Sequence, residues 1–363
     1  MRDTSSSTVT IAGAGPSGLA AAIALGRAGH KVRVLERAPT VGTRFHDDFQ
    51  GIENWTRAED ALEELSAGGI ARTFWARPFE GGTLFDRSRA ATRVRSGRPL
   101  FYVVRRGTGQ ADSLDRGLLR QALEVGVRVE FGTRADPSRV EIDASGPGRR
   151  PMAVARGITF PLEMNDSVVA ILDDALAPGG YVYFLVADRQ ATLATVLFRD
   201  FARADHYLDL SISALESLVA QAPLPRNPRW SGHGSFGLPP TLRDGGGIRV
   251  GEAAGFQDLL FGFGIRSAMV SGVLAARSIL HGYDYQRLWL DRLMPHMKAA
   301  VVNRAVYSVL GNVAKVSLCS MLRRTRRPED LMRRLYAFTP VHRVLFPLVR
   351  PRFARAGRSS TTA

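Results

Sequence analysis

Hydrophobic and polar residues alternate along the chain with two different periods, and the period changes in blocks. A strand-like run followed by a helical run, the pattern of a βα unit, occurs near residues 8–69, 106–150 and 246–282. A period close to two dominates between these blocks, near 70–105 and 153–237. The pattern predicts an α/β fold in which a nucleotide-binding domain is assembled from three separated pieces, with an antiparallel sheet domain packed beside it. We expect a ligand in the cleft between two such domains.

Start and stop signals place individual helices within this pattern. Residues 56–59 have the form of a capping box and predict a helix that ends at Gly68 and Gly69. Apolar residues at helical spacing indicate helical structure over residues 289–310. Pro328, which is followed by two acidic residues, predicts a further helix start near the C-terminus.

The first βα unit contains a glycine pattern that suits a phosphate group. A strand over residues 9–12 leads into Gly13, Gly15 and Gly18, spaced as Gly-x-Gly-x-x-Gly, and then into a helix. In such a turn the first glycine permits the tight turn, the second lets the backbone approach a pyrophosphate, and the third lets helix and strand pack closely. Glu36 closes the next strand 23 positions after Gly13, where an acid can bind a ribose hydroxyl. The pattern predicts dinucleotide binding; the alternative is a glycine-rich turn without a ligand.

Composition limits the classes of protein to which the chain can belong. With 363 residues it is long enough for two domains, each with its own core. The single cysteine, Cys319, excludes an internal disulfide and is typical of a reducing compartment. No cysteine or histidine cluster has metal-ligand spacing, the N-terminus has no apolar signal region, and no run of about 18 uncharged apolar residues occurs. We therefore expect a cytoplasmic protein without a bound metal.

The formal net charge of +15 is concentrated near the C-terminus, where residues 281–363 hold 16 Lys and Arg residues but four Asp and Glu residues. A basic region of this kind can bind nucleic acid, anionic lipid or nothing. No zinc finger, RNA-recognition motif or aromatic-interleaved basic strand is found, so we expect no nucleic-acid partner. Residues 341–349 combine apolar positions at helical spacing with Arg343 and Arg350. This suits either peripheral contact with an anionic membrane or a helical cap over a substrate cleft.

Four motifs together resemble those of the geranylgeranyl reductase family, which belongs to the larger class of flavoproteins with the p-hydroxybenzoate hydroxylase fold. The resemblance covers about 280 residues by motif and element order. The motifs are Gly13–Gly18 with Glu36, Arg105-Arg106 followed by Leu114-Asp115, Ile142–Gly146, and Gly251–Gly255 followed by Gly262–Ala268.

The resemblance implies a domain plan in three parts. Residues 1–69, 106–152 and 238–284 would form a discontinuous Rossmann-type FAD domain, 70–105 and 153–237 an inserted antiparallel substrate domain, and 285–363 a basic helical C-terminal region.

The last of the four motifs is the most specific. In the family it supplies an acid for the ribityl chain of FAD and, 12 positions later, a Gly-Ile pair that opens a helix aimed at the flavin ring. Here Glu252 and the Gly264-Ile265 pair keep that spacing, with Glu in place of the usual Asp. A helix N-terminus at the ring would stabilise the negative charge of reduced flavin.

The resemblance implies a set of FAD-binding residues. They are Gly13, Gly15, Pro16, Ser17 and Gly18 for the pyrophosphate, Glu36 for the adenosine ribose, Arg44 and Arg106 (with Arg105 as the alternate) for the flavin or its phosphates, and Glu252, Gly264 and Ile265 for the ribityl chain and ring. Arg37 and Gly262 are further expected FAD-binding residues.

The chain departs from related classes in informative ways. The Asp-Gly motif of flavin hydroxylases is not found after residues 142–146, and the catalytic lysine of flavin halogenases has no counterpart between Lys31 and Lys298. The prenyl-channel segment of archaeal-type reductases corresponds to residues 180–186, where Tyr181 is kept but Trp becomes Tyr183.

Reduction of a C=C bond needs a proton as well as a hydride, and three residues are candidates for supplying it. Tyr181 and Tyr183 can donate a proton or shape the pocket; the alternative is two tyrosines on an edge of a β-sheet. His46, beside Asp47 and Asp48, can form a tunable acid; the alternative is a polar surface loop.

The expected function is the FAD-dependent reduction of C=C bonds in an isoprenoid or similar apolar or lipid substrate. A flavin-dependent monooxygenase and an FAD-containing non-redox cyclase or binding protein are the alternatives. NAD(P)H, a ferredoxin or free reduced flavin are the candidate electron donors, because no separate nicotinamide domain is visible.

Overall fold

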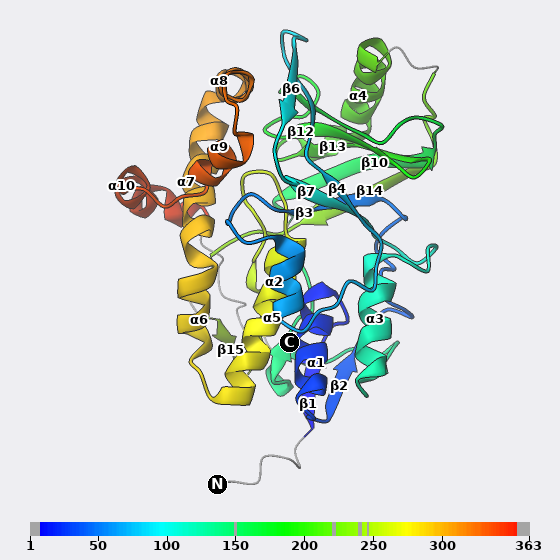
Figure 1. The fold of residues 1–363 in the computed structure, drawn as a ribbon, viewed down its shortest axis with the longest axis vertical. Helices are drawn as coiled ribbons and strands as arrows, with labels where there is room; N and C mark the ends of the chain where they lie inside the picture. The colour runs from blue at the N-terminus through cyan, green and yellow to red at the C-terminus, as the bar shows by residue number, and fades with distance from the viewer. Residues whose placement is uncertain (1–7, 149–150, 220–222, 239–241, 245–246, 354–363) are drawn as a thin grey trace.

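A computed structural model describes residues 8–148, 151–219, 223–238, 242–244 and 247–353. Its lower half in Figure 1 is built on a six-stranded sheet in the order β15-β16-β9-β1-β2-β8, parallel except for the β15–β16 pair. The strands are β1 (Val9–Ala12), β2 (Val32–Leu35), β8 (Arg128–Glu130), β9 (Ile142–Asp143), β15 (Arg243–Asp244) and β16 (Gly247–Arg249). Three separated parts of the chain therefore supply one sheet.

Helices α1 (Pro16–Arg27) and α5 (Ile265–His281) pack closely against each other in this domain. A Cβ atom at Gly272 would lie 2.1 Å from the carbonyl oxygen of Ser17, so no larger residue than glycine fits at the crossing. Helix α3 (Leu114–Glu124) packs on the other side of α1. The glycine turn and the start of α5 are thereby held in fixed positions relative to each other.

The second large sheet has seven strands in the order β14-β10-β13-β12-β11-β5-β6. All neighbouring strands are antiparallel except β11 and β5. The strands are β5 (Gly81–Asp86), β6 (Ala91–Arg95), β10 (Ala153–Pro161), β11 (Ser167–Leu172), β12 (Tyr181–Ala187), β13 (Gln190–Leu197) and β14 (Arg229–Gly234). Helix α4 (Ala204–Val219) packs on β10 and β13 and shares an apolar core with this sheet. The α/β fold with an inserted, largely antiparallel sheet is confirmed.

A small sheet in the order β3-β7-β4 lies between the two large ones (Figure 1). Its strands are β3 (Phe49–Glu53), β4 (Ala76–Phe79) and β7 (Phe101–Arg105), all antiparallel. β3 comes from the segment assigned to the FAD domain and β4 and β7 from the segment assigned to the substrate domain. This sheet therefore joins the two predicted domains by main-chain hydrogen bonds.

The C-terminal region forms five helices along one side of the molecule (Figure 1). They are α6 (Tyr285–Arg292), α7 (Met294–Leu310), α8 (Asn312–Arg324), α9 (Pro328–Leu335) and α10 (Pro340–Val349). The helical structure indicated for residues 289–310 is present but is divided between two helices, because α6 ends and α7 begins at Leu293. Pro295, in the first turn of α7, has no N–H group and cannot continue a helix from α6.

The predicted start of α2 (Ala61–Ala67) is wrong. The N-cap is Asp60, whose carboxylate accepts hydrogen bonds from the backbone N atoms of Leu62 and Glu63. The hydroxyl of Thr56, which the capping box required, donates instead to the carboxylate of Glu53. Because Thr56 is bonded to Glu53, it cannot cap the helix, which begins after Asp60 instead.

In the part of the chain that the structure describes, no single helix has the length and hydropathy to cross a membrane. The pair α7 and α8 meets the test together by length and composition, but the two helices are bent by 116°.

Candidate functional site

One cavity of about 820 Å³ lies where the three sheets meet the C-terminal helices. It begins at the glycine turn, passes the start of α5, and continues along β5, β11 and β12 to α8 and α9. This volume is within the range of ligand sites that hold a cofactor or drug-sized molecule. The cleft expected between the two domains is therefore present.

The glycine turn forms one end of the cavity. Gly13 has φ +98°, and a Cβ atom there would lie 2.3 Å from the carbonyl oxygen of Ala144, so a side chain is excluded. Gly15 is the N-cap of α1 and has no capping side chain, so the first N–H groups of the helix are left for a ligand. A Cβ at Gly15 would meet nothing within 4 Å, which leaves an open cradle facing the cavity. Pro16 and Ser17 line the same end.

We expect Gly15→Val to lower the affinity for FAD about tenfold or more, because the valine side chain would fill this cradle without clashing with the protein. Titration of FAD into the apoprotein measures the change. Gly97→Val is the matched control, since Gly97 is also free of neighbours within 4 Å but lies outside the cavity. Equal affinities of the two variants would contradict the assignment.

Glu36 lies beside the turn and lines the cavity. Its Oε2 accepts a hydrogen bond from the backbone N of Ala14 at 2.7 Å, and its Oε1 accepts one from the backbone N of Ala38 at 2.9 Å. These bonds hold the carboxylate at the cavity wall, and each oxygen retains a second acceptor position. The adjacent Arg37 is exposed and also borders the cavity. The role of both residues at a ribose stays a prediction.

Glu252 and Arg44 meet across the cavity from segments far apart in the chain. Glu252 lies in the short 3₁₀ helix η3 (Gly251–Ala254), and its Oε2 is 3.0 Å from Nη2 of Arg44. Its Oε1 accepts a hydrogen bond from the backbone N of Ser235 at 3.2 Å. The structure thus brings together two residues that the sequence places in the same cofactor site.

We expect Glu252→Gln to weaken FAD binding about tenfold, because a neutral amide replaces a charged acceptor where the resemblance places the ribityl chain. Glu163→Gln is the control, since Glu163 is an exposed partner of Arg189 away from the cavity. Fluorescence titration with FAD distinguishes the two. Unchanged affinity in Glu252→Gln would remove Glu252 from the site.

The start of α5 points its unsatisfied N–H groups at the cavity. Gly264 is the N-cap, without a capping side chain, and Ile265 is the first helical residue; both line the cavity, as does Gly262. Two buried polar atoms in the cavity wall, Oε1 of Gln257 and Oγ of Ser145, have no hydrogen-bond partner among the described residues. Two uncapped helix starts and two unpaired polar atoms are what a long cofactor with phosphates and ring carbonyls would satisfy.

The two adjacent arginines of the second motif point in different directions. Arg106 lines the cavity, forms a two-pronged ion pair with Asp115 (both N–O distances 2.9 Å), and stacks its guanidinium 3.8 Å from the ring centre of Phe45. Arg105 pairs with Asp112 and Asp188 and does not line the cavity. Successive residues at the end of β7 face opposite sides, so only Arg106 reaches the predicted site.

Tyr181 and Tyr183 both line the cavity from the same face of β12, with ring centres 6.3 Å apart. The hydroxyl of Tyr181 donates a hydrogen bond to the carbonyl oxygen of Phe261. Tyr183 has no hydrogen bond to any residue that the structure describes. Burial, and secondarily the charge of Asp48, raises the pKa of Tyr183 well above its ordinary value, so the hydroxyl stays protonated. Of the two, Tyr183 has the proton free for a ligand.

His46 borders the cavity but does not form the expected acid pair. Its imidazole stacks on Trp230 with ring centres 6.3 Å apart, and its backbone N, not its ring, donates to Asp48. Asp47 accepts from the backbone N of Gly109. Among the described residues, neither carboxylate forms a hydrogen bond with the imidazole, so the geometry does not show a histidine tuned by Asp47 or Asp48.

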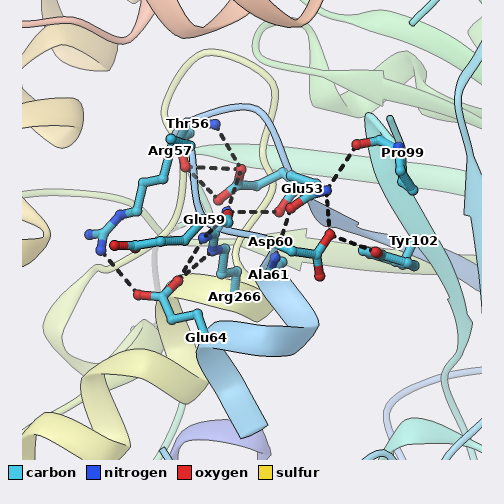
Figure 2. A network of polar contacts seen from close by, with 12 residues as sticks. Glu53, Thr56, Arg57, Glu59, Asp60, Ala61, Glu64, Pro99, Tyr102 and Arg266 are labelled. Atoms are coloured by element: carbon cyan, nitrogen blue, oxygen red, sulfur yellow. Dashed lines mark hydrogen bonds and ion pairs between the residues drawn. The ribbon is translucent and has the colours of Figure 1, made fainter. Parts of the chain in front are cut away.

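A buried charge network lies behind the first turn of α5 (Figure 2). Arg266, the second residue of α5, bonds Oε2 of Glu64 at 2.7 Å and lies 3.7 Å from Glu53. Arg57 bonds the other oxygen of Glu64 at 3.0 Å. Burial would raise the pKa of Glu64, but the charges of Arg266 and Arg57 outweigh it and hold that pKa below its ordinary value. The network ties α5 to α2 and so positions the cavity end of α5.

Sequence reasoning missed the residues that hold the loop between Glu252 and Gly264. Asp258 is half-buried there and accepts hydrogen bonds from two backbone N–H groups of its own loop and from the hydroxyl of Tyr336 at 2.7 Å. Burial raises the pKa of Asp258 to about 6. Arg304 on α7 donates to the carbonyl oxygen of Leu260 in the same loop. Tyr336 and Arg304 carry no local signal of this role, because both are distant in sequence.

The far end of the cavity is apolar. It is lined by Leu84, Val94, Leu100, Leu172, Leu318, Leu322 and Met332. The last three come from α8 and α9, so these two helices close this end. No residue of 341–349, the segment for which a helical cap is the alternative, lines the cavity. Within the described residues, no set of His, Cys, Asp or Glu side chains could hold a metal ion.

Comparisons with known proteins agree with this geometry. Residues 11–56 match the model of the NAD(P)-binding Rossmann-like domain. No curated protein sequence matched the chain. A geranylgeranyl bacteriochlorophyll reductase-like protein from Thermoplasma acidophilum superposes with a TM-score of 0.73 at 18% identity, covering 94% of this chain and 100% of that one.

Two further solved structures have other activities in their names. The flavin-dependent brominase Bmp2 superposes with a TM-score of 0.66 at 17% identity, covering 96% of this chain and 99% of the brominase. The oxygenase of 2-methyl-3-hydroxypyridine-5-carboxylic acid superposes with a TM-score of 0.59 at 15% identity, covering 89% and 95%. The chain therefore has the α/β fold that these flavin-dependent enzymes and the geranylgeranyl bacteriochlorophyll reductase-like protein share.

Proposed function

We propose that the chain is an FAD-dependent oxidoreductase that reduces C=C bonds of an isoprenoid or similar apolar substrate. The observation that carries the proposal is the single cavity, which joins a phosphate cradle and a second uncapped helix start to an apolar end. A cofactor held at the first two features would present its reactive end to a substrate held at the third.

The described residues fit FAD along its whole length. Gly15 and the start of α1 would hold the pyrophosphate, Glu36 the adenosine ribose, and Glu252 the ribityl chain. The start of α5 at Gly264 would face the ring and favour negative charge on it. When bound and reduced, FAD supplies the hydride in reactions of this kind.

The chain itself must supply a proton and keep water out. Tyr183 lines the cavity with a protonated hydroxyl that forms no hydrogen bond with any described residue. A hydroxyl within hydrogen-bond reach of the reacting carbon can deliver that proton. The leucine, valine and methionine side chains of the far end favour a substrate without charge and exclude bulk water from it.

The identity of the product tests the proposal. Purified chain is loaded with FAD and incubated without oxygen with a geranylgeranyl substrate, using NADPH, reduced ferredoxin or dithionite in parallel as reductant. We expect a product that has gained two hydrogen atoms per reduced bond. A product that gains an oxygen atom in air would establish the monooxygenase alternative, and an isomer of unchanged mass the cyclase alternative.

Halogenation is the activity that the cavity supports least. The resemblance associates that chemistry with a catalytic lysine, and no lysine lines the described cavity. Lys315 on α8 is buried against Asp174 at 3.0 Å, outside the cavity lining. We therefore do not extend the activity in the brominase's name to this chain.

A further inference from the structure

The C-terminal helices expose an unusual amount of apolar surface. Of the thirteen large hydrophobic side chains that are exposed in the described part of the chain, nine lie on α7, α8 and α10. We call them the C-terminal apolar surface: Val306, Val309, Leu310, Val313, Val316, Met321, Val341, Val344 and Leu348. Figure 1 shows these three helices on one side of the molecule, with α3 on the opposite side.

Each helix presents these residues as a stripe that faces solvent. Val341, Val344 and Leu348 follow helical spacing on α10 and are 64%, 71% and 72% exposed. On α8 the exposed Val313 and Val316 lie opposite Leu318 and Leu322, which are buried. An outward apolar stripe costs free energy in water, so a large set of them indicates a surface that is covered when the protein works.

The charge on the C-terminal helices indicates what covers the C-terminal apolar surface. Helices α7, α8 and α10 contain no Asp or Glu residue. The exposed Arg324, Arg326, Arg343 and Arg350 flank the apolar stripes and form no ion pair with the described residues. A second copy of this chain would bring the same positive charges face to face, which is unfavourable. Apolar side chains that project among unpaired arginines match the interface of an anionic lipid bilayer.

The surface is also connected to the cavity. The buried face of α8 contributes Leu318 and Leu322 to the apolar end, and its exposed face belongs to the C-terminal apolar surface. The single helix α8 therefore separates the C-terminal apolar surface from the apolar end of the cavity. The central part of α7, with Ala299, Ala300 and Val301, is packed inside the protein, so the exposed apolar residues of α7 lie near its C-terminal end.

We propose that the C-terminal apolar surface docks this protein on the face of an anionic lipid membrane, with the side chains at the α7–α8 bend and on α10 inserted among the lipids. Docking itself is independent of the catalytic proposal. The use of the membrane as the source of an apolar substrate, with α8 as the wall between lipid and cavity, rests on the proposed function.

Co-sedimentation of the full chain with vesicles tests the proposal without substrate or turnover. One vesicle is phosphatidylcholine alone, and the other is an equal mixture of phosphatidylcholine and phosphatidylglycerol. We expect binding to the mixed vesicles at low salt, much weaker binding to the neutral vesicles, and release as salt rises. No binding to mixed vesicles at low salt would overturn the proposal.

Two double variants locate the surface. Val309→Glu with Val313→Glu is expected to lower the vesicle affinity about tenfold or more, because two inserted side chains become charged. Arg343→Glu with Arg350→Glu is expected to lower it by a similar factor and to weaken its dependence on salt. The controls are Leu123→Glu, at a residue 52% exposed on α3, and Arg116→Glu with Arg134→Glu, at exposed arginines outside the C-terminal helices.

Retained FAD binding and circular dichroism establish that each variant is folded. If the surface variants bind vesicles as tightly as the controls do, the surface is misassigned. If the wild type instead forms a dimer in sedimentation velocity that Val309→Glu with Val313→Glu dissociates, and vesicles are not bound, the occupant is a second copy and the membrane proposal is wrong.

Discussion

Replacing Tyr183 with phenylalanine is expected to slow turnover about 10²–10⁴-fold while leaving FAD affinity unchanged. The ring still fills the cavity wall, but the one tyrosine hydroxyl there that no described residue engages is lost. The measurement is kcat for C=C reduction under anaerobic conditions, with the FAD affinity determined in parallel. A loss in kcat with little change in KM is the signature of an interaction made in the transition state.

Tyr181→Phe is the matched control on the same face of β12. Its hydroxyl is already bonded to the carbonyl oxygen of Phe261, so its removal loosens the neighbouring loop and does not remove an acid. We expect less than about a tenfold loss of kcat. The reverse order, with Tyr181→Phe the more damaging variant, would transfer the proton-donor role to Tyr181.

Replacing Arg266 with alanine is expected to lower the free energy of unfolding by about 3–5 kcal/mol, because the buried Glu53 would lose its ion pair with Arg266. The half-buried Glu64 would keep its ion pairs with Arg57 and Arg292 but lose the one with Arg266. Urea denaturation measures the change. Arg77→Ala is the control: its ion pair with Asp166 is exposed, and such pairs contribute about 1 kcal/mol or less.

The effect of Arg266→Ala is expected to depend on pH in one direction. The pKa of Glu64 is lower in the folded protein than in the unfolded chain, so its contribution is present above its unfolded pKa and is lost as pH falls through the folded pKa. The difference between wild type and Arg266→Ala should therefore be largest near pH 7 and shrink below about pH 4. A difference that grows on acidification would contradict the assigned network.

Parts of the fold that depend on one short segment could be predicted from the local sequence. Gly13, Gly15 and Gly18 lie within one short strand–turn–helix segment, where Gly13 and Gly18 have no room for a side chain, and the structure places this segment at the cavity. The three-piece parallel sheet follows from the change of hydrophobic period, which reports burial on one or two faces. The fold class was therefore predictable in full.

Features that depend on tertiary contacts were not predictable in the same way. The capping box at residues 56–59 looked complete locally, but Glu53 binds Thr56 and the helix starts after Asp60 instead. The break between α6 and α7 was also not predictable from apolar spacing over residues 289–310, because that spacing does not register the N–H group that Pro295 lacks.

The candidate site shows the same limit. Arg105 and Arg106 are equivalent in sequence, and only the side of β7 on which each emerges separates them. Leu318 and Leu322 reach the cavity from a helix whose sequence indicates no more than amphipathic packing. Sequence motifs therefore predicted residues at the cofactor end of the cavity but not those at its apolar end.

The sharpest test is to identify the cofactor that the purified chain binds, because FAD binding underlies every role proposed for the cavity. Denaturation of the protein, followed by mass spectrometry of the released cofactor and titration of FAD into the apoprotein, gives its identity and its stoichiometry. We expect FAD, about one per chain, with an affinity that Gly15→Val lowers and Gly97→Val does not. Release of no flavin, together with an apoprotein that does not bind FAD, would contradict it.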